Sequence, residues 1–511
     1  MKNIEEVAKK IGLTEENIIY YGKDILKIEK ELKEQKGDLI LVTAMNPTPF
    51  GEGKTTISIG VVDGLNKVGK SATGVLREPS MGPVFGMKGG ATGGGKASLI
   101  PEEKINLHFT GDFHAITTAN NLLCAAIDSH IYWGNELAID QKLFSRCMDI
   151  NDRSLRDIKV NDEHAKFNIT AASEIMSIFT LSISKEDLRT KLGNIMIGLT
   201  KKEEPIFAKD LDIINALYLI LEDAFKPNLV QTLEGNPVMV HGGPFANISH
   251  GCNSLIATKQ ALSVSDYVVT EAGFGADLGA EKFLDLYSRK GKLKPKAVVL
   301  VATIKSLKYN SKDKNSVEEG LSNLNRHIEN IKKFGITPVV ALNKFDTDTQ
   351  KEITVVEEYC KQDEIPFSLV ESFSLGGNGS IDLAKKVIES ISNNDYRPLY
   401  SDEQNIQEKI DIVAKEIYRV KKVIYTTKAK QTLEKIKSLG LETLPICIAK
   451  TPYSFTDDPK QLGAPTDFSI TVRDLEIYHG AGFIVVYLNH ILTMPGLSKD
   501  PNYKHIKKIV E

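Results

Sequence analysis

Residues 39–55 read LILVTAMNPTPFGEGKT: an apolar run at 39–42 is followed by a glycine-containing loop and then by Lys54 and Thr55. A strand that leads through such a loop into a helix can hold polyphosphate, because backbone N–H groups and the positive end of the helix face the phosphates. We expect Lys54 to reach the β and γ oxygens and the Thr55 hydroxyl to bind Mg²⁺. The loop departs from the pattern G-x-x-x-x-G-K-[ST] because Thr48 stands at the position of the first glycine.

The residues after the loop complete a βαβ unit. Apolar side chains follow at intervals of four, four and three residues, which is the spacing of one helix face: Ile57, Val61, Leu65 and Val68. Gly69 suits the end of that helix, and residues 72–76 have the composition of the next strand. The sequence therefore predicts that residues 48–55 bind a nucleoside triphosphate.

Length and composition describe an ordinary globular protein. The 511 residues indicate about three domains, or one large domain with smaller additions. Apolar and charged fractions of 41% and 26% are typical of globular chains. A formal net charge of −3 gives no indication of a nucleic-acid or membrane surface, so we expect neither partner.

The cysteines and the N-terminal residues indicate the cellular compartment of the protein. The five cysteines are widely spaced without a C-x-x-C pair, so we expect buried, reduced thiols and neither a disulfide framework nor a zinc site. The first residues are charged and lack an apolar signal segment. No apolar run approaches the about 20 residues of a membrane span. We expect a cytoplasmic protein.

Strand-like runs alternate with helical patterns from residue 38 onward. The strand-like runs lie at 39–43, 72–76, 238–241, 267–270, 297–302, 337–342 and 367–370. The helical patterns lie at 115–127, 171–180, 211–224, 253–262, 320–334 and 350–361. This alternation predicts an α/β fold with a doubly wound, mostly parallel sheet of the P-loop NTPase type and smaller additional domains. In such sheets ligands bind at the carboxyl ends of the strands.

Three regions are expected along the chain. Residues 1–345 form a P-loop α/β domain, 346–440 an α/β and helical region, and 441–511 a small C-terminal domain. Within them, residues 3–36 are expected to form short helices and 402–437 long charged helices.

Several further segments have an unusual composition, and most follow a strand. They are REPSMGP at 77–83, GMKGGATGGG at 86–95, NLHFTGDFHA at 106–115, HGGPFAN at 241–247 and EAGFGADLG at 271–279. Together with VATI at 301–304 and MPGL at 494–497, they closely resemble the formate–tetrahydrofolate ligases (10-formyltetrahydrofolate synthetases). The resemblance runs from about residue 38 to 497, which is nearly the whole chain.

The resemblance implies an ATP-dependent ligation in one-carbon folate metabolism. Formate would be joined to N10 of tetrahydrofolate through formyl phosphate, with release of ADP and phosphate. It also implies Mg²⁺ with ATP, a response to a monovalent cation, a homotetramer, and a tetrahydrofolate substrate that can be polyglutamylated. The ATP site would be the loop formed by Thr48, Pro49, Phe50, Gly51, Glu52, Gly53, Lys54 and Thr55.

Charged residues beside the loop fit this chemistry. Attack of formate on the γ-phosphate needs cations at both anions, and Lys54 supplies one of them. Arg77 has a planar guanidinium that can bind formate or formyl phosphate through two hydrogen bonds, and by resemblance it is the formyl-phosphate arginine. Glu78 is a candidate for a polar contact with the substrate. His114 and Asp112 are candidates for positioning or proton transfer in the second step.

Aromatic side chains are the candidates for holding the flat pterin. By resemblance, folate stacks between a Phe after an N-x-F strand and a Trp in a later segment. Phe345, in NKFD at 343–346, matches the first aromatic position, and Phe373, in ESFSLGG at 371–377, stands in place of the Trp. Phenylalanine keeps a stacking face but has less area and no indole N–H, so we expect a modest effect on folate affinity.

Other readings of the loop remain open. NKFD at 343–346 also fits the guanine-reading motif of GTPases, in which Asp346 would bind the base, although no D-x-x-G segment follows the loop at ordinary spacing. A binding or assembly ATPase related to dethiobiotin synthetase would share the sheet and the loop. About 37 residues precede the synthetase-like region, so we expect a monofunctional chain without dehydrogenase and cyclohydrolase activities.

Overall fold

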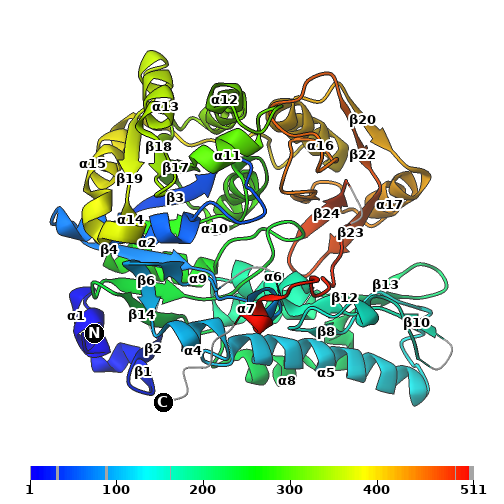
Figure 1. Cartoon of the computed structure of the whole chain (residues 1–511). Helices are drawn as coiled ribbons and strands as arrows, with labels where there is room; N and C mark the ends of the chain where they lie inside the picture. The colour runs from blue at the N-terminus through cyan, green and yellow to red at the C-terminus, as the bar shows by residue number, and fades with distance from the viewer. Residues whose placement is uncertain (1, 30–33, 87–89, 161–162, 489–490, 506–511) are drawn as a thin grey trace.

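The computed structural model describes residues 2–505 except 30–33, 87–89, 161–162 and 489–490. Its centre is a large mixed sheet (Figure 1). The strands follow the order β1 (Ile18–Tyr21), β2 (Ile25–Ile28), β14 (Asn228–Thr232), β15 (Pro237–Val240), β4 (Ala72–Leu76), β16 (Tyr267–Glu271), β3 (Asp38–Ala44), β17 (Pro295–Ala302), β18 (Val339–Asn343) and β19 (Phe367–Val370). β6 (Ala97–Ile100) pairs with β14, and β5 (Gly93–Gly94) pairs with β6.

The direction of pairing changes across the sheet. From β15 to β19 every neighbouring pair is parallel. β1, β2, β14 and β6 pair antiparallel with their neighbours. The α/β class is therefore confirmed, and so is every strand-like run expected from the sequence; residues 367–370 of the second expected region form the edge strand β19.

Helices cover both faces of the sheet. Leu39 and Leu41 of β3 pack into a core with α9 (Leu255–Val264), α12 (Val317–Lys333) and α13 (Gln350–Gln362). Ile40 and Val42 point to the opposite face, as alternate residues of a strand must. They pack against α2 (Lys54–Lys67) and α15 (Ile381–Ser390).

The N-terminal expectation was wrong in part. After α1 (Ile4–Lys10) and a short 3-10 helix (Glu15–Asn17) the chain forms the β1–β2 hairpin instead of further helices. The β-branched and aromatic side chains of residues 18–21 favour a strand, and Gly22 supplies the positive φ of the turn. Pairing of Leu26 with Leu229 then joins the hairpin to the main sheet.

The remaining elements lie beside the main sheet (Figure 1). A helical layer contains α5 (Asp112–Tyr132), α6 (Glu174–Leu181), α7 (Lys185–Gly193) and α8 (Ile214–Leu221). Short strands follow α5: β7 (Gln141–Lys142), β8 (Cys147–Met148), β9 (Ile158–Val160), β10 (Glu163–Ala165), β11 (Asn168–Ile169), β12 (Met196–Leu199) and β13 (Pro205–Phe207). The C-terminal part contains α16 (Ile406–Val413), β20 (Lys422–Tyr425), α17 (Thr427–Ser438), β21 (Ile446–Ala449), β22 (Ser469–Val472), β23 (Asp474–Tyr478) and β24 (Phe483–Tyr487).

The C-terminal part corrects a second expectation. Residues 402–437 contain two helices, α16 and α17, as expected, but an unexpected strand, β20, lies between them and pairs with β22. All five cysteines are buried free thiols, as expected. Within the part of the chain that the structure describes, no helix combines the length and the apolar character of a membrane span.

Candidate active site

The loop at residues 48–53 joins the carboxyl end of β3 to the first residue of α2, Lys54. Gly53 has φ +73°, and a Cβ there would lie 2.6 Å from Asn343 Nδ2, so this position favours glycine both for its backbone and for space. The buried Glu52 carboxylate connects the loop to the end of β17. It accepts hydrogen bonds from the Thr48 N–H at 2.6 Å and from the hydroxyl of Thr303, the residue after β17, at 2.5 Å. Phe50 is 81% exposed at the outer edge of the loop.

The end of β18 is attached to the same loop. Asn343 Nδ2 donates a hydrogen bond of 3.1 Å to the Glu52 carbonyl. Hydrogen bonds from the ends of β17 and β18 therefore fix the expected phosphate loop. The first backbone N–H groups of α2 have no partner within the helix and can bind a ligand.

Lys54, Thr55 and Arg77 converge on one carboxylate, Glu271. The Thr55 hydroxyl lies 3.0 and 3.2 Å from the two Glu271 oxygens, and Arg77 Nη2 lies 3.9 Å from Glu271 Oε1. Desolvation lowers the pKa of Lys54, and the nearby Glu271 and Glu52 oppose that shift. These groups come together because β3, β4 and β16 are neighbours in the sheet and end at the same edge.

A small pocket of about 180 Å³ adjoins Arg77. Its lining includes residues 77–80 after β4, Asn247, and Gly273 in the turn after β16. Arg77 Nη1 donates to the Pro244 carbonyl at 3.4 Å, while its buried Nε has no hydrogen-bond partner among the described residues. The pocket thus joins the 77–83, 241–247 and 271–279 motifs at a single place.

Glu78 belongs to a buried charged group beneath this pocket. Its side chain is 3% exposed, and Oε2 has no hydrogen-bond partner among the described residues. Desolvation raises the pKa of Glu78 well above its usual range, Asp112 raises it further, and Lys27 opposes the shift. Asp112 itself accepts from Lys27 Nζ at 2.8 Å and from Asn228 Nδ2 at 2.7 Å. Lys27 lies on β2, in the region for which the sequence predicted only solvated helices.

The structure separates His114 from this group. Asp112 and His114 both lie in the first turn of α5, but Asp112 is 1% exposed and His114 is exposed. Residues two apart on a helix do not face each other. Of the two candidates from this motif, only Asp112 is therefore grouped with Glu78.

We expect Lys27→Met to destabilise the protein by about 3–5 kcal/mol, because it leaves Asp112 buried without its cation. Urea unfolding followed by circular dichroism measures the change. The matched control is Lys104→Met, which removes an exposed lysine that pairs with Asp24 at 3.1 Å and should cost at most about 1 kcal/mol. Equal stabilities of the two variants would contradict the assigned importance of the buried pair.

Phe345 and Phe373 follow adjacent parallel strands. Phe345 comes directly after β18 and is 44% exposed, and Phe373, in α14 (Ser372–Leu375) after β19, is 61% exposed. An ion pair of 2.8 Å between Lys344 and Glu371 connects the two strand ends. Both rings therefore lie at the carboxyl-end edge of the sheet and are open to a ligand.

The glycine-rich segment packs against Phe373. The Lys96 N–H donates to the Phe373 carbonyl at 2.8 Å, and a Cβ at Gly95 would lie 2.9 Å from the aromatic ring. The glycines at 94 and 95 therefore allow close approach of the backbone to this side chain. Residues 87–89 of the motif lie outside the described residues.

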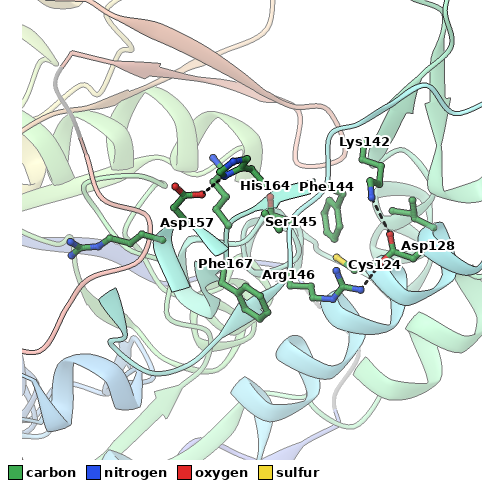
Figure 2. A pocket seen from close by; sticks show the side chains of 13 residues that line it. Cys124, Asp128, Lys142, Phe144, Ser145, Arg146, Asp157, His164 and Phe167 are labelled. Atoms are coloured by element: carbon green, nitrogen blue, oxygen red, sulfur yellow. Dashed lines mark hydrogen bonds and ion pairs between the residues drawn. The ribbon is translucent and has the colours of Figure 1, made fainter. Parts of the chain in front are cut away.

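A larger pocket of about 430 Å³ lies elsewhere, along α5 and the strands that follow it (Figure 2). Its charged side chains are largely paired with one another: Asp128 with Lys142 at 3.5 Å and with Arg146 at 2.5 Å, and His164 with Asp157 at 2.8 Å. None of the candidate catalytic, nucleotide or folate residues lines this pocket. Volume alone does not make it the active site.

Sequence reasoning missed Glu271 and Lys27 as members of the site. Glu271 carried a usable signal, because an acidic residue that ends a buried strand lies at the ligand-binding edge of an α/β sheet. No sequence signal marked Lys27, because its burial depends on the pairing of β2 with β14.

A comparison with protein families agrees with this geometry. The family model described as formate–tetrahydrofolate ligase matches residues 1–510 of the 511-residue chain. The match spans the loop, the Arg77 pocket and both exposed phenylalanines. The chain therefore belongs to the formate–tetrahydrofolate ligase family, and the protein is a ligase.

Proposed function

We propose that the protein joins formate to N10 of tetrahydrofolate through formyl phosphate, using ATP and releasing ADP and phosphate. The observation that carries the proposal is the position of the Arg77 pocket directly beside Lys54 and Thr55. Two successive transfers at one place require the phosphoryl site and the formyl site to be adjacent.

In the first step a formate oxygen attacks the γ-phosphorus and the bond to the ADP oxygen breaks. The loop behaves as a P-loop: its N–H groups and Lys54 hold the phosphates. Arg77 binds formate and then the formyl phosphate that forms, aided by the fork geometry of its guanidinium. Because the transferred charge is spread over phosphoryl oxygens, positioned cations supply most of the catalysis.

Mg²⁺ fits the oxygen donors of this site. The Thr55 hydroxyl and the Glu271 carboxylate are the hard ligands that Mg²⁺ prefers, and they lie beside the phosphate loop. When bound with ATP, the ion would neutralise phosphate charge. We infer that Thr55 holds it.

In the second step the N10 amine attacks the formyl carbon, phosphate leaves and the amine loses a proton. Glu78 lines the Arg77 pocket, and its buried Oε2 has no hydrogen-bond partner among the described residues. Its raised pKa makes its ionised form a stronger base than an ordinary carboxylate. Phe345 and Phe373 hold the pterin between their faces, as their exposure and adjacent positions favour.

The test is ADP release from ATP with formate alone, with tetrahydrofolate alone, and with both. We expect fast turnover only with both substrates, matched by formation of 10-formyltetrahydrofolate, because formyl phosphate must pass its formyl group to tetrahydrofolate before the site can begin another cycle. Turnover indifferent to formate and folate would reject the proposal in favour of a plain nucleotidase or a switch protein.

A further inference from the structure

Gly273 lines the Arg77 pocket in the turn after β16, and its missing side chain would face the Arg77 guanidinium. A Cβ at this position would lie 3.1 Å from Arg77 Nη1 and 3.3 Å from Nη2. We propose that Gly273 is a positioning residue for formate, because its lack of a side chain keeps the two terminal nitrogens of Arg77 open to the carboxylate. This inference rests on the proposed function and identifies a residue that gives formate access to the guanidinium.

Space, not backbone conformation, accounts for the glycine at this position. Gly273 does not have the positive φ that favours glycine over other residues. Its neighbours limit the space for a side chain instead: a Cβ would meet the two Arg77 nitrogens and would lie 2.4 Å from the Ala246 Cβ. The contact with Ala246 concerns packing alone, whereas the contact with Arg77 concerns the group that binds the substrate.

The terminal nitrogens of Arg77 are able to accept a further partner. Nη1 makes a long hydrogen bond of 3.4 Å to the Pro244 carbonyl, and Nη2 lies 3.9 Å from Glu271 Oε1, which is beyond hydrogen-bond distance. A guanidinium and a carboxylate form shorter and stronger bonds than these, of about 2.7–2.9 Å. A methyl group at position 273 would contact both nitrogens and cover part of the guanidinium that formate needs.

The turn at Gly273 is held in place by the backbone around it. The Gly273 N–H donates a hydrogen bond of 3.1 Å to the Gly251 carbonyl. A Cβ at Gly279 would lie 1.8 Å from the Gly273 carbonyl oxygen, so the π-helix at Ala276–Ala280 packs its backbone directly against the turn. Because close-packed backbone moves little, an added methyl group at position 273 would stay beside Arg77.

The test moves one methyl group across the contact between Gly273 and Ala246. Gly273→Ala adds a methyl group beside Arg77, and the double variant Ala246→Gly/Gly273→Ala removes the methyl group with which it would clash. Steady-state synthesis of 10-formyltetrahydrofolate by the full-length protein gives KM for formate and for ATP. We expect KM for formate to rise about 10-fold or more in Gly273→Ala, the usual effect of one methyl group in a binding pocket. It should stay raised in the double variant relative to Ala246→Gly, while KM for ATP changes little.

The control is Gly198→Ala on β12, where a Cβ would lie 2.8 Å from the Gln141 carbonyl oxygen; it should lower the urea unfolding midpoint and leave KM for formate unchanged. A KM for formate in the double variant equal to that of Ala246→Gly would overturn the proposal, because the defect would then come from the Ala246 contact alone. If only one of the two Gly273 variants folds, a wild-type KM for formate in that variant would overturn it as well. Failure of the wild-type protein to make 10-formyltetrahydrofolate would instead reject the proposed function.

Discussion

Lys54→Ala is expected to lower kcat for 10-formyltetrahydrofolate synthesis by about 10²–10³-fold, the usual cost of removing one positioned donor from a developing anion. Lys54 is the first residue of α2, so its ammonium and the helix N-terminus act on the same phosphates. Desolvation by burial lowers the pKa of Lys54. A bound polyanion would favour the charged form, and the ammonium would then contribute more than an exposed lysine does.

Steady-state kinetics with all three substrates, together with calorimetry of nucleotide binding, measure this effect. The matched control is Lys67→Ala at the other end of α2, whose ammonium pairs with Glu234 at 3.2 Å and is far from the loop in sequence. Near-wild-type kcat in the folded Lys54 variant would contradict the assignment of residues 48–55 as the phosphate loop.

The sequence could specify the loop because its signals are local. The apolar run before residue 48, the glycines at 51 and 53 and the helical spacing after Lys54 all lie within a short stretch. The structure places β3 and α2 at the positions that this pattern indicates, and β4 and β19 have the bounds that were expected. Local propensity and tertiary packing agree in these elements.

The sequence could not specify what depends on the order of strands. Glu271 meets Thr55 because β16 lies between β4 and β3, an order that no local pattern encodes. The β1–β2 hairpin had a local signal in residues 18–21, but its place in the main sheet depends on the pairing of β2 with β14. Lys27 became a buried ion-pair partner only through that pairing.

The family match and the geometry together favour the ligase over the other readings of the loop. Asn343 contacts the loop as a member of NKFD, but Lys344 of that motif is paired with Glu371 at 2.8 Å. The lysine of the motif that a switch GTPase would use to read guanine thus pairs with a glutamate at the end of the neighbouring strand β19. The Arg77 pocket, which a switch would not need, is built from three of the long motifs instead.

Arg77→Ala is expected to lower kcat by about 10³-fold, at the lower end of what a transition-state arginine contributes to phosphoryl transfer. KM for formate should also rise, because Arg77 is the only cation that lines its pocket among the described residues. Arg77→Lys should recover little of the loss, since an ammonium cannot form the paired hydrogen bonds that a guanidinium makes with a carboxylate or an acyl phosphate.

Rescue separates a chemical role for Arg77 from a structural one. If the guanidinium acts on the substrate, added guanidinium ion should restore part of kcat in Arg77→Ala, because the deletion leaves space in a pocket of about 180 Å³. The control is Arg146→Ala, which removes an arginine from the larger pocket of Figure 2 and should leave turnover near the wild-type value. Near-wild-type turnover in Arg77→Ala would exclude it as the formyl-phosphate ligand. A loss of kcat together with a lowered urea unfolding midpoint and no rescue by guanidinium would mean that Arg77 mainly neutralises the buried Glu271 carboxylate, 3.9 Å away.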